Sequence, residues 1–185
     1  VCEKKLLGTA GTLRANKDFF QDCTTLLVHA DNWCQCDFAD FLNYHLKHRP
    51  EHCSITMMIF ESPTPETCGI VETDTKGVVL SFHEKSNNPP GKQANGAVYL
   101  LEPEVIEWID NHEGISDFST EVLPHFMGHT WYNDVLTGGG AWVGAGPGAG
   151  ARARAGTGTE LRALELLDHR ERLHVAVGTR AGRGG

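Results

Sequence analysis

The sequence predicts an α/β fold, and three features support that prediction. Residues 24–31 and 54–60 are short apolar runs of the kind found in strands that are buried on both faces, as in a parallel sheet. Between them, Asp37 precedes a helical pattern that ends before Pro50. Strand, helix and strand alternate as in a βαβ unit, so we expect a mixed, mostly parallel sheet.

The segment after residue 60 contains a hairpin signature. Residues 69–73 and 78–84 read as two strands that are joined by Asp-Thr-Lys-Gly, a typical turn sequence. The hairpin delivers Glu84 and Lys85 to the end of its second strand. Adjacent unlike charges are most often a solvated pair, and a pair of functional residues is the alternative.

Four further elements follow. Residues 95–101 predict a strand, and Pro103 opens a helix at a position where proline is tolerated. Asp117 can cap one more helix, and residues 129–133 read as a last strand.

A small-residue loop, residues 6–13, precedes the first apolar run and leads into a helix that ends near Phe20. Gly8 and Gly11 in this loop would let a ligand or another strand approach the backbone closely. A plain helix entry explains the same residues equally well.

Length and charge limit the classes of function. The 185 residues fit one ordinary domain, and the net charge of -8 with a pI near 5.6 argues against a protein that binds nucleic acid or anionic membrane through bulk charge. Neither a bilayer-spanning apolar run nor a signal-peptide pattern is present in the sequence. We therefore expect a soluble, cytoplasmic protein without nucleic-acid or membrane partners, and six free thiols.

Two cysteines close to the first apolar run raise the question of a zinc site. Cys34 and Cys36 lie near His29 and Asp31. Structural zinc sites usually bring two paired motifs with two to four residues between ligands, whereas this pair has one intervening residue and no second pair. The zinc interpretation is therefore disfavoured.

The composition changes after Asp134. All seven lysines and all eight phenylalanines precede that point, whereas thirteen of the 21 glycines follow it. We expect a first domain over residues 1–134 and a disordered or loosely packed tail over residues 135–185, with a short helix near residues 159–173. A linker with a docking helix is one explanation, and a reading frame that slipped in a G/C-rich gene is the favoured one.

Asp31 follows the first apolar run directly. In open α/β sheets ligands bind beyond the carboxyl ends of strands, so a carboxylate at this place can hold a metal ion against a phosphorylated substrate. The alternative is that Asp31 begins a turn or caps a helix. The residues of this run do not decide between the two.

Taken in order, the motifs resemble the sugar-phosphate nucleotidylyltransferases. The resemblance is carried by Leu-Gly-Thr-Ala-Gly at 7–11, Leu-Val-His-Ala-Asp-Asn at 27–32, Cys-Gly-Ile-Val-Glu at 68–72 with Phe-His-Glu-Lys at 82–85, and Asn-Gly-Ala-Val-Tyr-Leu-Leu at 95–101. Within this family, the motifs are most similar to those of the mannose-1-phosphate and heptose-1-phosphate guanylyltransferases. It implies a GT-A-like, Rossmann-related fold and the transfer of GMP from GTP to a sugar 1-phosphate, with release of pyrophosphate.

The resemblance also implies roles for single residues on the nucleotide side of the site. Gly8 and Thr9 would line the nucleobase pocket. Asp31 would ligate Mg²⁺ beside the nucleoside triphosphate, which makes it one of two catalytic residues. Mg²⁺ is commonly held by one or two carboxylates together with phosphate oxygens, so a single aspartate at a strand end is consistent with this role.

On the sugar side, the resemblance implies that Gly69 and Asn95 face the sugar. Glu84 would accept hydrogen bonds from sugar hydroxyls. Lys85, the second catalytic residue, would hold the phosphate of the sugar 1-phosphate. This division suits phosphoryl-type transfer, in which the protein mainly positions its substrates and neutralises charge.

The chain also departs from the family pattern. Family members begin with a strand and a glycine-rich loop that grips the triphosphate, whereas this sequence begins after that point. Members place a second metal carboxylate in an Asp-x-Gly-Thr segment, which Asp134 does not match. We therefore expect an incomplete sheet and impaired turnover.

Two other functions remain as alternatives. One is a non-catalytic domain that binds a nucleotide-sugar or regulates a partner. The other is a GT-A glycosyltransferase, which normally carries Asp-x-Asp where this chain has Asp31-Asn32-Trp33. The sequence leaves open the base, the sugar and whether the chain forms a homo-oligomer.

Overall fold

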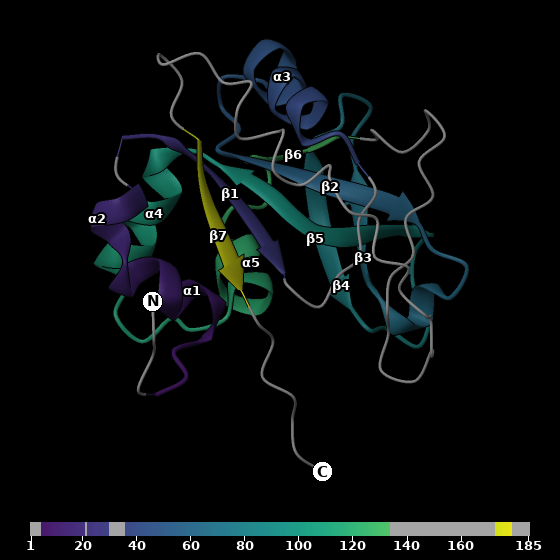
Figure 1. The fold of residues 1–185 in the computed structure, drawn as a ribbon. Coiled ribbons are helices and arrows are strands. Elements are labelled where there is room, and N and C mark those ends of the chain that lie inside the picture. Colours follow the sequence, from purple (N-terminus) through teal and green to yellow (C-terminus); the bar gives the residue numbers. More distant parts are fainter. Residues whose placement is uncertain (1–4, 21, 30–35, 134–172, 179–185) are drawn as a thin grey trace, which may run out of the picture.

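The fold is a mixed sheet with helices on both faces, seen in a computed structural model that describes residues 5–20, 22–29, 36–133 and 173–178 (Figure 1). The strands are β1 (Thr24–His29), β2 (Ile55–Glu61), β3 (Gly69–Thr73), β4 (Val79–Glu84), β5 (Gln93–Leu101), β6 (Thr130–Asn133) and β7 (Leu173–Gly178). The helices are α1 (Gly8–Ala15), α2 (Lys17–Phe20), α3 (Phe38–His48), α4 (Pro103–Asn111) and α5 (Leu123–His125), with a 3₁₀ turn η1 (Pro65–Thr67) and a π-helical turn η2 (Phe118–Val122). The predicted α/β class is confirmed.

The sheet is built around β5, which pairs antiparallel with β1, β2 and β3. The strand order is β4-β3-β5-β1-β7, and β6 adds to β2. Since β1 and β2 both run against β5, they point the same way, as a βαβ unit requires. However, β5 lies between them.

The expected parallel majority is wrong for the described strands. Four of their pairings are antiparallel, and only β1 with β7 and β2 with β6 are parallel. A continuous apolar run reports burial on both faces, and helices that cover both faces bury an antiparallel strand just as well. Burial was therefore predicted correctly and strand direction was not.

Strand β7 belongs to the segment for which the sequence predicted a loosely packed tail. It pairs parallel with β1 along the full length of that strand, from Thr24 opposite Leu173 to His29 opposite Gly178 (Figure 1). The predicted helix near residues 159–173 otherwise lies outside the described residues. Residues 173–178 thus form a sheet element that the sequence analysis did not anticipate.

Neighbouring residues on the central strands point to opposite faces of the sheet and enter two separate cores. One core packs the sheet against α3, and the other packs it against α1, α4 and α5. The α3 core contains Leu26, Phe41, Leu42, Met58, Val98 and Leu100. The larger core includes Leu13, Leu27, Met57, Tyr99, Ile109, Phe118 and Leu123. The alternation along β1 and β5 is the two-residue period of a strand that is buried on both sides.

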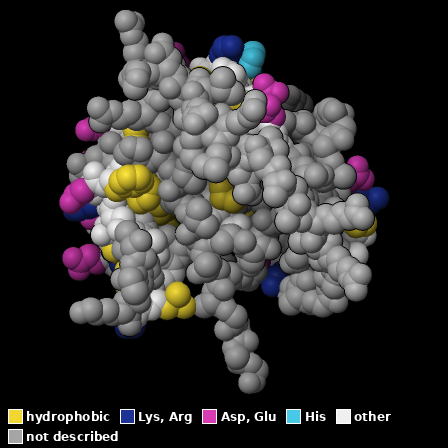
Figure 2. Space-filling model, in the orientation of Figure 1, with side chains coloured by type: hydrophobic (Ala, Val, Ile, Leu, Met, Phe, Trp, Pro, Cys, Tyr) yellow, Lys and Arg dark blue, Asp and Glu magenta, His cyan; other side chains and the backbone are white. Residues whose placement is uncertain are grey.

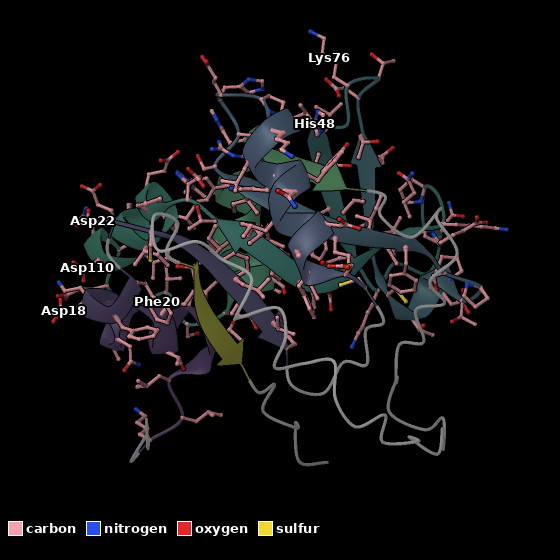
Figure 3. All side chains as sticks on the ribbon, turned by 45° about the horizontal axis from the view of Figure 1, so that its top comes forward. Asp18, Phe20, Asp22, His48, Lys76 and Asp110 are labelled. Carbon is pink, nitrogen blue, oxygen red and sulfur yellow. The ribbon has the colours of Figure 1, made fainter. Side chains whose placement is uncertain are left out.

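Polar side chains cap the starts of helices and link one helix to another. The side chain of Asp37 accepts hydrogen bonds from the backbone N–H groups of Ala39 and Asp40 at the start of α3, as predicted. Asp117 caps η2 in the same way through Thr120, at 2.8 Å. Helix α2 is tied to α4 by an ion pair of 2.6 Å between Lys17 and Asp110, one of the residues labelled in Figure 3.

A buried polar network joins α3 to the sheet. The imidazole of His45, which is 1 % exposed, lies 2.7 Å from the Thr56 hydroxyl and 2.8 Å from the Glu102 carboxylate. Arg49 pairs with the other oxygen of Glu102 at 3.0 Å, and Thr24 donates to the first at 3.2 Å. Strands β1 and β2, helix α3 and the start of α4 therefore meet at one carboxylate.

One face of the molecule shows how hydrophobic and charged side chains are distributed on the surface. In the orientation of Figure 1, the coloured hydrophobic side chains show as small separate spots, and most of the coloured acidic and basic side chains lie toward the rim (Figure 2). No helix within the described ranges is long and apolar enough to cross a membrane. The four cysteines in that part of the chain, Cys23, Cys36, Cys53 and Cys68, are thiols that form no disulfide with one another, as expected.

The network predicts a pH-dependent contribution to stability. The hydrogen bond from His45, together with Arg49, lowers the pKa of Glu102 below its ordinary value of 4.5. Glu102→Gln should lower the free energy of unfolding by about 1–3 kcal/mol at pH 7, because a largely buried charged hydrogen-bond acceptor is lost. Chemical denaturation at several pH values measures this difference.

The sign of the pH effect follows from the lowered pKa of Glu102. The carboxylate contributes fully above pH 4.5 and loses its contribution as pH falls through the folded-state pKa. The difference between wild type and Glu102→Gln should therefore shrink in acid. Glu107→Gln, which changes an exposed carboxylate on α4, is the control. A difference that stays constant down to the acid-unfolded state would contradict this account.

Candidate functional site

Three strands bring predicted sugar-side residues into one row. Gly69 on β3 is the register partner of Glu84 on β4. On its other side, β3 pairs with β5 through Ile70 and Ala94, so one residue further along each strand Gly69 lies opposite Asn95. Side chains opposite one another on neighbouring strands share a face of the sheet. Glu84, Gly69 and Asn95 therefore form a row across β4, β3 and β5.

Gly69, which has no side chain, lies in the middle of this row. A Cβ atom at this position would lie 2.5 Å from the Phe82 ring and 3.0 Å from a carboxylate oxygen of Glu84. The Glu84 carboxylate therefore extends over the glycine, into space that any larger residue would occupy. The glycine thus lets the Phe82 ring and the Glu84 carboxylate pack against the backbone of β3.

Lys85 follows Glu84 in a left-handed backbone conformation, with φ of 48°. Its backbone N–H donates to the carbonyl of Cys68 at 3.1 Å, which anchors the turn beside Gly69. For a residue with a side chain, such a conformation costs about 1–3 kcal/mol and persists only where the surroundings fix it. The lysine is thus held in a defined position next to the row.

The third member of the row, Asn95, begins an irregularity in β5. The register with β2 shifts between Met57 and Ile59, and Ala97 has φ of 53°. Gly96 passes close to β2, since a Cβ there would lie 3.0 Å from the Met58 carbonyl oxygen. The Asn95 side chain accepts a hydrogen bond from the Ala97 N–H at 2.9 Å. Two of the three non-glycine residues with positive φ in the described chain, Lys85 and Ala97, therefore lie beside this row.

Tyr99 lies beneath the row with its side chain fully buried. Its hydroxyl accepts a hydrogen bond from the Asn95 amide at 2.6 Å. Burial is the main cause that raises the pKa of Tyr99 to about 12, and the carboxylates of Glu84 and Asp117 act in the same direction. The hydroxyl therefore stays protonated at neutral pH.

The predicted nucleobase residues are packed against the segment that follows α4. Thr9 is 8 % exposed, and its hydroxyl accepts a hydrogen bond from the Phe118 N–H at 2.8 Å. Gly8, with φ of 77°, lies so close to Ser116 that a Cβ would come within 2.3 Å of its carbonyl oxygen. Phe118 in turn contacts the Tyr99 ring at 4.9 Å between centroids. Gly8 and Thr9 are thus linked to the row through Phe118 and Tyr99.

Asp31 lies outside the described residues, so its predicted role as a magnesium ligand stays a prediction. Strand β1 ends at His29, whose ring centroid is 6.5 Å from that of Tyr99. Within residues 5–20, 22–29, 36–133 and 173–178, no group of three or more His, Cys, Asp or Glu side chains could hold a metal ion. The described residues therefore give no metal-site geometry. Cys34 also lies outside them, so the zinc interpretation is not tested further.

Sequence reasoning missed the residues that support the row. Tyr99 and Phe118 read only as apolar members of a strand and a helix, and Ala97 carried no signal. Gly96 could have revealed the irregularity, because an isolated glycine within a strand pattern often marks a bulge. The hydroxyl of Tyr99 becomes informative only when its partners are known.

Comparison with known proteins decides the family. The sequence profile of the Nucleotidyl transferase family matches residues 1–146, more than half of the chain. The chain belongs to this family. The predicted resemblance to sugar-phosphate nucleotidylyltransferases is thereby confirmed, as is the prediction that the family consists of enzymes.

Two relatives of the chain carry the predicted guanylyltransferase name. The chain is 29 % identical over 127 residues to the mannose-1-phosphate guanylyltransferase of Mycobacterium tuberculosis (strain ATCC 25618 / H37Rv). This match covers 69 % of the chain and 34 % of the relative. The chain is 32 % identical over 105 residues to the catalytic subunit beta of mannose-1-phosphate guanylyltransferase from Dictyostelium discoideum, covering 56 % and 28 %. The chain thus spans about a third of the length of these relatives.

A third relative has a different base. The glucose-1-phosphate adenylyltransferase of Desulfitobacterium hafniense (strain Y51) is 27 % identical over 130 residues, covering 65 % of the chain and 32 % of the relative. Among solved structures, HddC from Yersinia pseudotuberculosis complexed with GMP-PN matches with a TM-score of 0.61 at 19 % identity, covering 78 % of this chain and 59 % of that one. The structural match supports the fold predicted from the resemblance.

The row predicts that Gly69 tolerates no side chain. Gly69→Ala should lower the free energy of unfolding by about 1–2 kcal/mol, because the new methyl group displaces Phe82 and the Glu84 carboxylate. Thermal unfolding measures the change. Gly91→Ala is the matched control, since a Cβ at Gly91 meets nothing within 4 Å. Equal melting temperatures for the two variants would contradict the described packing around Gly69.

Proposed function

We propose that this chain transfers the GMP group of GTP to a sugar 1-phosphate and releases pyrophosphate. The observation that supports this proposal is the row of Glu84, Gly69 and Asn95, with Lys85 beside it in a strained conformation, in a chain of the Nucleotidyl transferase family. Strained residues cluster at sites where the surrounding structure fixes them for function. A cytoplasmic location is part of the same proposal.

In this proposal the row binds the sugar. The Glu84 carboxylate over Gly69 accepts hydrogen bonds from sugar hydroxyls, and the Asn95 amide offers both a donor and an acceptor. Gly69 lets the Phe82 ring and the Glu84 carboxylate lie close to the backbone of β3, beside which the sugar is proposed to bind. A sugar is recognised in this way because its adjacent hydroxyl groups need several fixed polar partners.

Lys85 holds the phosphate of the sugar 1-phosphate. An ammonium group beside a phosphate forms charge-assisted hydrogen bonds and lowers the repulsion between that phosphate and the triphosphate of GTP. A phosphate oxygen of the sugar 1-phosphate then attacks the α-phosphorus of GTP. One P–O bond forms, the bond between the α-phosphorus and the bridging oxygen breaks, and pyrophosphate leaves with the bonding electrons. The attacking oxygen is already deprotonated at neutral pH, so the step requires no protein base.

Gly8 and Thr9 line the base-binding side in this proposal, next to the segment that contains Ser116 and Phe118. Asp31 is proposed as the residue that would hold Mg²⁺, which neutralises phosphate charge when it is bound. The assignment of guanine and mannose draws on the names of two relatives, whereas a third relative is named for adenylyl transfer to glucose 1-phosphate.

The sugar-phosphate role of Lys85 can be tested by titration with α-D-mannose 1-phosphate. Lys85→Ala should weaken binding about 10- to 100-fold, the equivalent of about 1.4–2.8 kcal/mol for a lost charge-assisted hydrogen bond. Isothermal titration calorimetry measures the affinity. Lys76→Ala removes the same charge at the other end of the hairpin, where Figure 3 shows Lys76 pointing away from the fold, and should bind like wild type. Equal losses in both variants would contradict the assignment.

The reaction itself is tested by incubating the chain with GTP, α-D-mannose 1-phosphate and MgCl₂ and measuring GDP-mannose and pyrophosphate by ³¹P NMR. Asp31→Asn should abolish product formation and leave the affinity for mannose 1-phosphate within twofold of wild type, because the aspartate is assigned to the nucleotide side. Asp40→Asn, at the exposed start of α3, is the matched control. Binding of GDP-mannose without any turnover would favour a non-catalytic nucleotide-sugar-binding domain instead.

A further inference from the structure

The side chain of Asn95 is held at both ends. Its amide oxygen accepts a hydrogen bond from the Ala97 N–H at 2.9 Å, and its amide nitrogen donates to the Tyr99 hydroxyl at 2.6 Å. A backbone N–H can only donate, so the oxygen must face Ala97 and the nitrogen must face Tyr99. The orientation of the amide is thereby fixed by its partners.

The direction of the hydrogen bond to Tyr99 follows from this orientation. The Asn95 amide nitrogen can only donate, so the Tyr99 oxygen accepts. The Tyr99 ring cannot turn easily, since it is fully buried and contacts Phe118 at 4.9 Å between centroids. A chain of hydrogen bonds thus runs from the Ala97 N–H through the Asn95 amide to the Tyr99 hydroxyl.

We infer that Tyr99 is a positioning residue for the sugar 1-phosphate, because its hydroxyl sets the direction in which the Asn95 amide meets the sugar. The inference rests on the proposed function. With one N–H and one oxygen lone pair committed to the protein, Asn95 keeps one N–H and one lone pair for a ligand. Both are presented in the row that contains Gly69 and Glu84.

The hydroxyl of Tyr99 needs a reason beyond packing. A phenylalanine would fill the same core space and would avoid the cost of burying a hydroxyl group. The structure instead places that hydroxyl at the irregularity in β5, where Ala97 has φ of 53°. Without it, one Asn95 N–H would lose its partner and the side chain could turn away from the row.

A double-mutant cycle tests this inference on the full chain. The affinity for α-D-mannose 1-phosphate is measured by calorimetry for wild type, Tyr99→Phe, Asn95→Ala and the double variant. Tyr99→Phe should weaken binding about 10-fold in the wild-type background, as expected for one lost hydrogen bond in a fixed network. In the Asn95→Ala background the same substitution should change the affinity by less than twofold, because Tyr99 acts through Asn95.

Two further measurements separate positioning from a general structural role. The affinity for GTP should stay within twofold of wild type in Tyr99→Phe. Tyr44→Phe, which removes a hydroxyl on α3, should leave the affinities for mannose 1-phosphate and GTP unchanged. The inference is overturned if Tyr99→Phe weakens sugar-phosphate binding equally in both backgrounds, if it leaves that binding unchanged, or if it weakens GTP binding to the same extent. Absence of sugar-phosphate binding in wild type would instead contradict the proposed function, and this role of Tyr99 with it.

Discussion

The structure depends on the pairing of one strand with three others. Strand β5 hydrogen-bonds to β1, β2 and β3, so every described strand except β4, β6 and β7 meets it directly. A strand in this position must be regular over most of its length, because each of its backbone groups has a partner to satisfy. β5 is regular from Val98 to Leu101 and irregular at Gly96 and Ala97. The candidate site lies at that irregularity.

Two different kinds of interaction surround β5. On the α3 side, the core residues are joined by the network in which His45, Arg49 and Thr24 meet the Glu102 carboxylate. Loss of one partner would leave the partly buried Glu102 carboxylate incompletely paired, so this network ties the position of α3 to the sheet. On the other side, Tyr99 and Phe118 connect the row to Gly8 and Thr9. The polar groups of the row therefore come from the strands themselves, Glu84 from β4 and Asn95 from β5.

Parts of the fold followed from the sequence for identifiable reasons. Asp37 and Asp117 were predicted as caps because a carboxylate before an amphipathic pattern satisfies unpaired backbone N–H groups. The hairpin of β3 and β4 followed from its turn sequence, which also placed Glu84 and Lys85 at a strand end. Strand direction did not follow, because helices on both faces give parallel and antiparallel strands the same apolar composition. The pairing of β7 with β1 was equally invisible, because its partner lies more than a hundred residues away in the sequence.

The sequence by itself determined the α/β class, the helix starts, the hairpin and, through the order of four short motifs, the family. Through the same resemblance it predicted that Gly69, Glu84, Lys85 and Asn95 belong to one sugar-phosphate site. Only the tertiary structure decided that Gly69 lies between Glu84 and Asn95 in a row, that Lys85 and Ala97 are strained, and that Tyr99 fixes the Asn95 amide. The physical reason is that caps and turns involve groups a few residues apart, whereas strand register and buried hydrogen bonds join groups whose proximity the folded sheet alone creates.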